Sequence, residues 1–286
     1  MGAFYQSYTY TDSAMSNIDL IRSITGFRER ELASRKLLIA EGKLVTERLL
    51  GSKLEVRLVV CTPELEPYAR TLVNTRCEVQ IMPEKDMSEL AGYAFHRGIL
   101  AIGTRPAALS FEDFLSQVPK QAALPHQAVK RVIVCPDVHD PQNLGALFRN
   151  AKAFGWQAVA LGKNGVSPWS RRAIRVSMGA VFDVPVLELS GKEDLATLGK
   201  HAYLRVGTSA AAAPDSLDNL CLQLNQLQQI EQNPQALALV FGNEFSGLAS
   251  DWAKVCDRLC SIPMSEGHDS LNVATSAAIF MYRLGR

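Results

Sequence analysis

Three widely spaced segments of the chain are rich in small and polar residues at positions where a core would be apolar. They span residues 143–149, 242–247 and 262–272. The third runs from a short apolar stretch through a polar loop into Val273–Phe280, which has the composition of a buried helix. A strand–loop–helix junction of this kind points backbone N–H groups into the loop, where they can bind a ligand carboxylate or carbonyl.

The first segment has a simpler explanation when it is considered alone. Asn143 is a residue type favoured at helix N-caps, and Gly155 is placed to end the same helix. Arg149 is harder to explain, because it lies in an otherwise apolar run that should face a sheet. It could still extend its charged end to solvent along that run.

The second and third segments also fit ordinary structure. Gly242–Gly247 could be a glycine turn after a buried strand, with Glu244 stabilised by the dipole at a helix start. Ser270 could be the N-cap of the last helix, and Asn272 a residue of its first turn. A functional interpretation therefore depends on the three segments occurring together.

The second half of the chain repeats short apolar strands and helices, which is typical of a parallel sheet flanked by helices. Ligands of such sheets bind beyond the carboxyl ends of the strands, and each polar segment follows a predicted strand. The sequence therefore predicts one shared site. The strands are predicted at Arg131–Cys135, Ala158–Leu161, Val184–Leu189, Ala202–Val206, Leu237–Phe241 and Cys260–Pro263.

The first half predicts a mobile tail over residues 1–16, with Met15 as a second candidate start, and then a compact α/β unit over residues 17–105. Residues 106–130 carry Pro106, Pro119 and Pro125, which predicts a linker with at most one helical turn. In the α/β unit we expect helices at Phe27–Leu38 and Gly42–Leu50 and strands at Val56–Cys61 and Gly98–Ile102.

The composition limits the classes of protein to be considered. The chain has 286 residues, 47% hydrophobic and 21% charged, which is typical of a globular protein of two domains. No apolar run approaches the roughly 20 residues that span a bilayer, and the N-terminus lacks a signal pattern, so we expect a cytoplasmic protein with no membrane partner. Cys256 and Cys260 have a helical spacing but no further Cys or His pair, so we expect buried thiols and no metal.

The net charge of +1 means that any nucleic-acid binding must depend on local patches. Arg22, Arg28, Arg30, Arg35 and Lys36 are interleaved with acidic residues, which favours a solvated helix face. A second group has almost no acid nearby in the sequence, so an RNA contact and plain surface remain equal alternatives. It comprises Lys163, Arg171, Arg172 and Arg175.

Taken together, the three segments resemble one family. The order Asn143-x-Gly145-x-x-x-Arg149, Gly242-x-Glu244-x-x-Gly247-Leu248, and Ile262-Pro263-Met264 with Ser270-Leu271-Asn272-Val273 is similar to the SpoU (TrmH-like) branch of the SPOUT RNA methyltransferases. The first half resembles that family's substrate-binding domain, which is similar to the ribosomal L30e fold. This second likeness rests on residues 38–49 and 96–101.

The resemblance implies an α/β fold: an L30e-like RNA substrate-binding domain over residues 17–105, then a SpoU methyltransferase domain over residues 131–286 with a parallel sheet and a deep trefoil knot. Such knots are exceptions to ordinary chain topology. It also implies S-adenosylmethionine as cofactor, a homodimer with the knots packed together, and methyl transfer to a ribose 2′-hydroxyl of tRNA or rRNA.

We expect three sets of site residues, the first two from the resemblance and the third from the basic residues of the chain. Those surrounding the reacting hydroxyl are Asn143, Arg149, Glu244, Ser270 and Asn272. Those holding the cofactor are Phe241, Gly242, Asn243, Gly247, Ile262, Met264, Ser270, Leu271 and Asn272. Those expected to bind RNA are Arg35, Lys36, Arg97, Arg171, Arg172 and Arg175.

Arg149 is often taken as the base in this family, yet a guanidinium group is effectively always protonated. We therefore expect Arg149 to clamp the adjacent RNA phosphate and stabilise the developing alkoxide. Glu244 would orient Arg149, and Asn143 or Ser270 would fix the ribose.

Two positions depart from the family pattern. Glu266 and Phe245 occupy positions where glycine is usual, which predicts added bulk at both cofactor loops, with Phe245 narrowing the entrance. His139 and His268 lie in the first and third motifs. A loop histidine is more often solvated than catalytic, but one that titrates near neutrality could assist proton removal.

Two other functions are alternatives to this one. A knotted RNA-binding protein with weak or lost methyltransferase activity is compatible with the altered loops, although the polar motif positions are intact. A nucleotide-binding enzyme of the dehydrogenase type is disfavoured, because no Gly-x-Gly-x-x-Gly follows the first strand of the second half. The motifs do not name the RNA, since tRNA and rRNA substrates share them.

Overall fold

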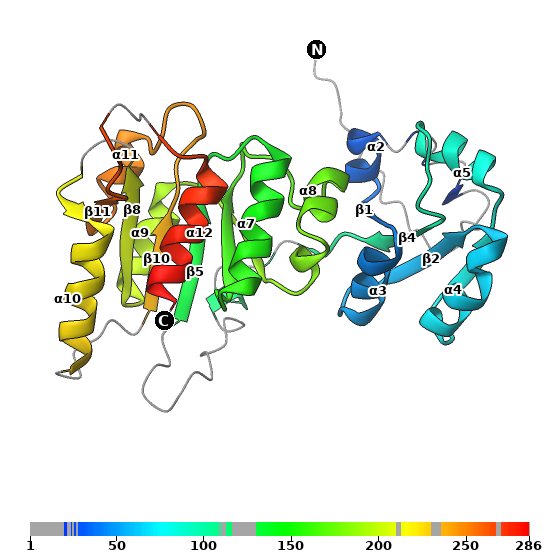
Figure 1. The fold of residues 1–286 in the computed structure, drawn as a ribbon, viewed down its shortest axis with the longest axis horizontal. Coiled ribbons are helices and arrows are strands. Elements are labelled where there is room, and N and C mark those ends of the chain that lie inside the picture. The colour runs from blue at the N-terminus through cyan, green and yellow to red at the C-terminus, as the bar shows by residue number, and fades with distance from the viewer. Residues whose placement is uncertain are drawn as a thin grey trace, which may run out of the picture.

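The computed structural model describes residues 20–21, 24, 26, 28–107, 109, 113–115, 130–209, 213–229, 236–266 and 270–285. These residues form two α/β units that follow one another along the chain (Figure 1). The predicted tail at residues 1–16, most of the predicted linker and His268 lie outside the described residues.

The first unit is a four-stranded sheet in the order β1-β4-β2-β3, in which β4 is antiparallel to β1 and β2, and β3 is parallel to β2. Leu58, Val60 and Leu100 are buried with the residues of one helical layer, which includes Leu32 and Met87. The strands are β1 (Leu37–Glu41), β2 (Val56–Cys61), β3 (Glu78–Ile81) and β4 (Ile99–Thr104), and the helices are α2 (Glu29–Ser34), α3 (Lys43–Gly51), α4 (Glu66–Val73) and α5 (Glu84–Ala91).

The predicted helix at Phe27–Leu38 is wrong at its C-terminal end. The helix stops at Ser34, and Lys36 has φ of +54°, a left-handed conformation that turns the chain into β1. All five residues of β1 are buried. A short run buried on both faces has no alternation, so its periodicity does not distinguish a strand from a helix.

The second unit is a seven-stranded sheet in the order β7-β6-β5-β10-β8-β11-β9, and each neighbouring pair is parallel, which confirms the predicted parallel sheet. The two-residue strand β9 was not predicted. The strands are β5 (Lys130–Cys135), β6 (Ala158–Gly162), β7 (Val186–Leu189), β8 (Tyr203–Ser209), β9 (Asp215–Ser216), β10 (Ala236–Val240) and β11 (Arg258–Ser261).

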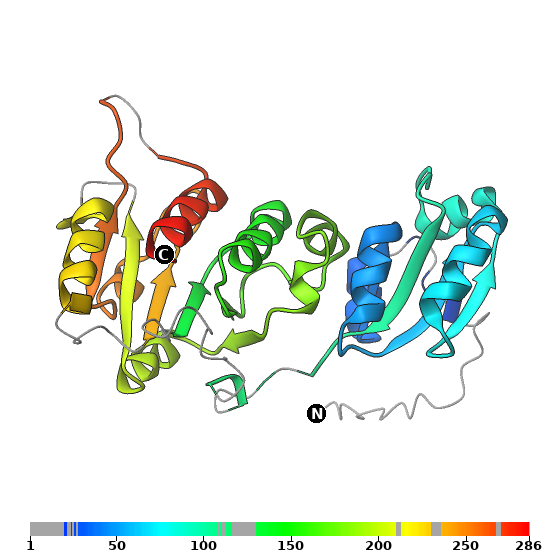
Figure 2. The ribbon, with the colours of Figure 1, turned by 60° about the horizontal axis from the view of Figure 1, so that its bottom comes forward.

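Helices cover both faces of this sheet (Figure 2). One face carries α7 (Pro141–Ala153), α8 (Arg171–Val176), α10 (Leu217–Gln229) and α12 (Val273–Leu284), and the other carries α9 (Lys192–Lys200) and α11 (Ser250–Ala253). Phe114, in the predicted linker, is fully buried on the second face. The linker therefore contributes to the core at that point.

Helices α7, α8 and α12 pack closely on the first face. A Cβ atom at Gly145 would lie 2.8 Å from the Ala173 carbonyl oxygen, so only glycine allows α8 to approach α7 at this distance. Asn150 Nδ2 donates to the Ala274 carbonyl oxygen at 3.1 Å, and Trp156 Nε1 donates to that of Met281 at 3.1 Å. These bonds hold α12 at both ends.

The two units meet at a buried ion pair. The side chain of Glu41, on β1, is 3% exposed, and its Oε1 lies 2.5 Å from Arg171 Nη2 at the start of α8. Tyr93 Oη donates to Glu41 Oε2 at 2.7 Å, and Arg48 Nη1 donates to the Met178 carbonyl oxygen at 2.6 Å. Arg171 has almost no acid nearby in the sequence, but the fold supplies one, because its partner Glu41 comes from the other unit.

Candidate active site

A cavity of about 120 Å³ lies where the strands β8, β10 and β11 end and α12 begins. It sits at the carboxyl edge of the sheet, where the sequence predicted one shared site. The residues predicted to hold a cofactor that line it are Phe241, Gly242, Asn243, Gly247, Ile262, Met264, Ser270 and Leu271. Asn272 lies just outside the lining.

Sequence reasoning missed part of this wall. Thr208 and Ser209, at the end of β8, also line the cavity. They form a fourth polar stretch directly after a predicted strand, Ala202–Val206, which is the signal that identified the other three. Phe280 closes the interior and contacts Phe241 edge to face, with ring centroids 6.0 Å apart.

The loop after β10 is a closed turn. Asn243 and Gly247 exchange backbone hydrogen bonds of 2.9 and 3.0 Å. Asn243 Oδ1 accepts from the backbone N–H of Phe245 at 2.9 Å and of Ser246 at 3.3 Å, while its Nδ2 donates to the Asp137 carbonyl oxygen at 3.1 Å. The backbone and side-chain hydrogen bonds of Asn243 therefore hold the turn closed.

Gly242 allows this turn to close. A Cβ atom at this position would lie 2.1 Å from the carbonyl carbon of Gly247 and 2.1 Å from the backbone nitrogen of Leu248. Both contacts are with backbone, so no side-chain rotation relieves them. Gly242 is therefore required because any side chain at this position would collide with the backbone of Gly247 and Leu248 in the same loop.

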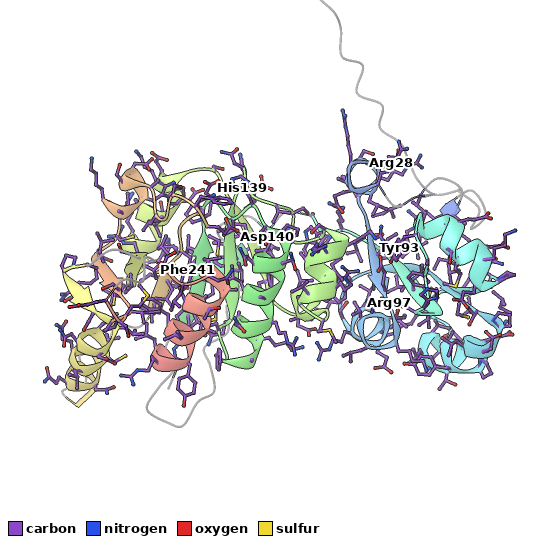
Figure 3. The ribbon with its side chains drawn as sticks, turned by 45° about the horizontal axis from the view of Figure 1, so that its top comes forward. Arg28, Tyr93, Arg97, His139, Asp140 and Phe241 are labelled. Carbon is purple, nitrogen blue, oxygen red and sulfur yellow. The ribbon has the colours of Figure 1, made fainter. Side chains whose placement is uncertain are left out.

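Three polar side chains from three separate segments form a hydrogen-bonded chain beside the cavity. Asn143 Nδ2 donates to Glu244 Oε1 at 3.0 Å, and Asn272 Nδ2 donates to Asn143 Oδ1 at 2.9 Å. Glu244 Oε1 also accepts from the backbone N–H of Asp140 at 3.1 Å. Figure 3 labels Asp140 and His139 at this edge of the sheet. This series of hydrogen bonds thus links the loops after β5 and β10 to the start of α12.

Glu244 is held in its ionised form. Burial favours its neutral form, but hydrogen bonds from Asn143, its own backbone N–H, Asp140 and His139 outweigh burial and lower the pKa of Glu244 below its usual 4.5. At neutral pH the site therefore presents a fixed negative charge. His139 lies at the rim, with Nε2 2.7 Å from Asp137 Oδ1.

The helix caps differ from the predicted ones. Asp140, not Asn143, caps α7 by accepting from the backbone N–H of Gln142 at 2.8 Å, and Asn143 is buried in the first turn. Asn272, not Ser270, caps α12 by accepting from the backbone N–H groups of Ala274 at 2.9 Å and Thr275 at 3.3 Å. With Pro141 at the first helical position, α7 begins earlier than the Asn143 cap required.

Replacing Asn272 with alanine is expected to lower the free energy of unfolding by about 0.5–2 kcal/mol, because α12 loses its cap. It also removes the hydrogen bond to Asn143. Asn272→Ser retains a capping oxygen but lacks the amide donor, so it should restore most of the stability without restoring the polar chain. Urea unfolding of the three proteins measures the difference, and equal stability of wild type and Asn272→Ala would contradict the capping role.

Arg149 does not lie beside this chain of side chains. The prediction that it faces the sheet is wrong, because Leu147, Phe148 and Ala151 occupy the buried side of α7 and Arg149 is exposed. Arg149 is six positions after Asn143, which places it about 9 Å further along the helix axis and on a different face. Within the described residues, no hydrogen bond or ion pair fixes its guanidinium group.

The residues predicted to bind RNA are spread over both units. Arg35, Lys36, Arg97 and Arg172 are exposed, Arg175 is half-buried, and Arg171 is engaged by Glu41. Arg97 lines an open cavity of about 430 Å³ together with Lys43 and His96 in the first unit. Figure 3 labels Arg97 on this unit, away from Phe241 and Asp140.

The two departures add little bulk inside the cavity. Phe245 contributes to the lining but is 95% exposed, and Glu266 is also exposed. The expectation that Phe245 narrows the entrance is therefore not supported by its position. Its ring projects outward from the turn.

The six cysteines are free thiols. Cys256 follows α11, and Cys260 is buried in β11. Burial raises the pKa of both thiols to about 12. It also raises the pKa of the buried Cys135 thiol. Among the described residues, no group of three His, Cys, Asp or Glu side chains could hold a metal ion, and no helix is long and apolar enough to cross a bilayer.

The fold and the site define an α/β enzyme whose ligand lies at the carboxyl edge of a parallel sheet, beside a fixed carboxylate. The sequence model of the SpoU rRNA Methylase family matches residues 130–282. The chain belongs to this family and is an RNA methyltransferase.

Relatives agree with this assignment. An uncharacterized tRNA/rRNA methyltransferase of Mycobacterium tuberculosis is 31% identical over 261 residues, 88% of this chain and 82% of the relative. The 23S rRNA (guanosine-2′-O-)-methyltransferase RlmB of Nitrosomonas europaea is 33% identical over 219 residues, 76% of each chain. The SpoU methyltransferase AviRb of Streptomyces viridochromogenes, solved in complex with AdoMet, has a TM-score of 0.74 at 20% identity, covering 93% of this chain and 96% of its own, and supports the fold.

Proposed function

We propose that this protein transfers a methyl group from S-adenosylmethionine to a ribose 2′-hydroxyl of ribosomal or transfer RNA. The observation that carries the proposal is the hydrogen-bonded chain Glu244–Asn143–Asn272 beside the cavity. The relative RlmB is named as a guanosine-2′-O-methyltransferase of 23S rRNA. We expect the reaction to take place in the cytoplasm, where these RNA molecules occur.

The lining of the cavity suits the cofactor chemically. Gly242, where a Cβ would be excluded, leaves backbone atoms accessible in the wall, and Ile262, Leu271 and Phe280 provide apolar surface for an adenine ring. The volume of 120 Å³ is below the roughly 300–1,000 Å³ that encloses a drug-sized ligand. Binding therefore separates the loops or leaves part of the cofactor exposed at the mouth.

The bound cofactor supplies a methyl group on a positively charged sulfur, and the protein must position the alcohol and help it to lose its proton. The ribose oxygen forms the new O–C bond while the C–S bond breaks. Glu244 supplies a fixed negative charge near the reacting centre, and Asn143 holds that charge in place. Ser270, exposed at the rim, completes the polar wall that faces the ribose.

The homodimer and the knot are part of the same proposal. Arg149 is exposed and makes no hydrogen bond or ion pair with the described residues, so a second copy packed on α7 and α12 would give it a site to act on. Tyr282, 40% exposed, and Phe154 form an edge-to-face pair at this helix pair, which is apolar surface suited to such a contact. Membership of the SpoU family, which the sequence resemblance associates with a knotted chain, supports the knot.

Arg149→Lys is expected to reduce turnover roughly tenfold or more, because an ammonium group cannot reproduce a bidentate phosphate clamp. The side chain is exposed, so the midpoint of thermal unfolding should not change. Single-turnover methylation measures the first quantity and differential scanning calorimetry the second. Near-full turnover of the variant would show that Arg149 does not clamp a phosphate.

The proposed function is tested in two steps. Isothermal titration calorimetry with S-adenosylmethionine and S-adenosylhomocysteine should give saturable binding with one site per subunit. Unmodified bacterial rRNA and tRNA are then incubated with protein and cofactor, and ribose methylation is mapped as resistance to alkaline cleavage. Cofactor binding without methylation of either RNA, by protein that still binds RNA, would favour the RNA-binding alternative.

A further inference from the structure

Phe245 is the most exposed of the large apolar side chains in the described chain, at 95% of its surface. Burying an aromatic side chain of this size stabilises a folded protein, so leaving this ring in water forgoes that stabilisation. Its position is set by the turn after β10, in which Asn243 Oδ1 accepts the Phe245 backbone N–H at 2.9 Å. The ring is thus held outward from a closed turn.

The ring is adjacent to the proposed reacting centre. Phe245 directly follows Glu244, whose carboxylate is bonded to Asn143 and Asp140. The Cα atoms of the two residues are about 3.8 Å apart, and both residues line the same cavity. A second exposed apolar side chain, Leu271 at 38%, lines the same cavity from the segment before α12.

We propose that Phe245 is a stacking platform for a nucleobase of the RNA, either that of the methylated nucleotide or that of its neighbour. This inference rests on the proposed function, because it takes the ribose hydroxyl to lie beside Glu244. The 2′-carbon is bonded to the carbon that carries the base, so a ribose at Glu244 brings a base to the same side of the site. Phe245 then replaces the stacking that the base loses when its nucleotide enters the site.

The cofactor is a poorer occupant for this ring. Phe245 borders the cavity, yet 95% of its surface is open to solvent, so a ligand enclosed by the cavity leaves most of the ring uncovered. The ring therefore contacts a molecule that arrives from outside the cavity. RNA bases are flat and apolar on their faces, and every base can stack on an aromatic ring.

The test compares Phe245→Ala, Phe245→Tyr and wild type for RNA affinity in excess S-adenosylhomocysteine. The probe is a short single-stranded RNA that contains 2-aminopurine, with protein-free bacterial rRNA as a competitor. Removing one base–aromatic contact is expected to weaken binding roughly 5- to 150-fold, and Phe245→Tyr should bind within about twofold of wild type. The 2-aminopurine emission should be quenched by wild type and Phe245→Tyr, and not by Phe245→Ala.

Leu222→Ala is the matched control, because Leu222 on α10 is 60% exposed and does not line the cavity. It should leave RNA affinity unchanged. Equal RNA affinity of Phe245→Ala and Leu222→Ala would overturn the proposal. A loss of S-adenosylmethionine affinity with unchanged RNA affinity would also overturn it, because the ring would then cover the cofactor. A halved mass in light scattering with unchanged RNA affinity would assign the ring to a subunit interface instead.

These outcomes separate this inference from the proposed function. If wild type binds no cofactor and methylates no RNA, the proposed function fails, while the effect of Phe245→Ala on RNA affinity is still measured. If wild type methylates RNA and Phe245→Ala does so with the same KM for RNA, the stacking role alone fails.

Discussion

Replacing Glu244 with glutamine is expected to lower the rate of methyl transfer about 10²–10³-fold, the range found when one fixed polar group is removed from a charge-stabilising site. Glutamine has the same length but no negative charge. Its carboxamide carries an NH2 group in place of one carboxylate oxygen. That group would face the N–H donors of Asn143, Asp140 or His139 and could not accept hydrogen bonds from them. Single-turnover methylation with saturating RNA and cofactor measures the loss.

The pH dependence of stability provides a second measurement on the same variant. The pKa of Glu244 is lowered in the folded protein, so the stability that its ionisation contributes is complete above about pH 4.5. It is lost as the pH falls through the lowered pKa. Wild type should therefore unfold at a higher temperature than Glu244→Gln near neutral pH, and the two should converge in acid.

Glu188→Gln is the matched control for this pair of measurements, because Glu188 is an exposed carboxylate on β7. It should change neither the methylation rate nor the difference between neutral and acidic unfolding midpoints. Full activity of Glu244→Gln would show that the charge of Glu244 has no part in the reaction.

Replacing Gly242 with alanine is expected to disable cofactor binding and to lower the free energy of unfolding by about 1–3 kcal/mol, the usual cost of overpacking. The new methyl group would lie 2.1 Å from the backbone of Gly247 and Leu248, whereas real Cβ atoms essentially never lie closer than 3.0 Å to another heavy atom. The turn must therefore move by nearly an ångström. Because Gly247 and Leu248 line the cavity, we expect affinity for S-adenosylmethionine to fall at least tenfold.

Two other glycines separate steric from conformational effects. A Cβ atom at Gly51 would have no described atom within 4 Å, and the φ of this residue is ordinary, so Gly51→Ala should be neutral. Gly247 has open space but φ of +69°, so Gly247→Ala should cost about 1–2 kcal/mol through strain alone. Calorimetric titration and urea unfolding of the three variants give the comparison. Wild-type cofactor affinity in Gly242→Ala would mean that the turn can open without affecting the cavity.

The sequence by itself determined the class of fold and the location of the site. Short β-branched strands alternating with helices predicted the parallel sheet, and the polar segments after β10 and β11 predicted the cavity, because the carboxyl ends of parallel strands share one edge. The motif spacings identified the family. These features are local in the chain, so they can be read without knowing which distant segments meet.

The tertiary structure decided the partners of individual side chains. Arg171 appeared free of acid in the sequence, but Glu41, 130 residues away in the chain, pairs with it at the junction of the two units. The sequence suggested Asn143 as a helix N-cap and Asn272 as a residue of the first turn of the last helix. In the structure Asn143 bridges Glu244 and Asn272, while Asn272 caps α12. Arg149 faces solvent, because the packing of α7 against the sheet selects which side of the helix is buried. Helix phase and long-range pairing depend on the whole packed core, so residue types along one segment do not specify them.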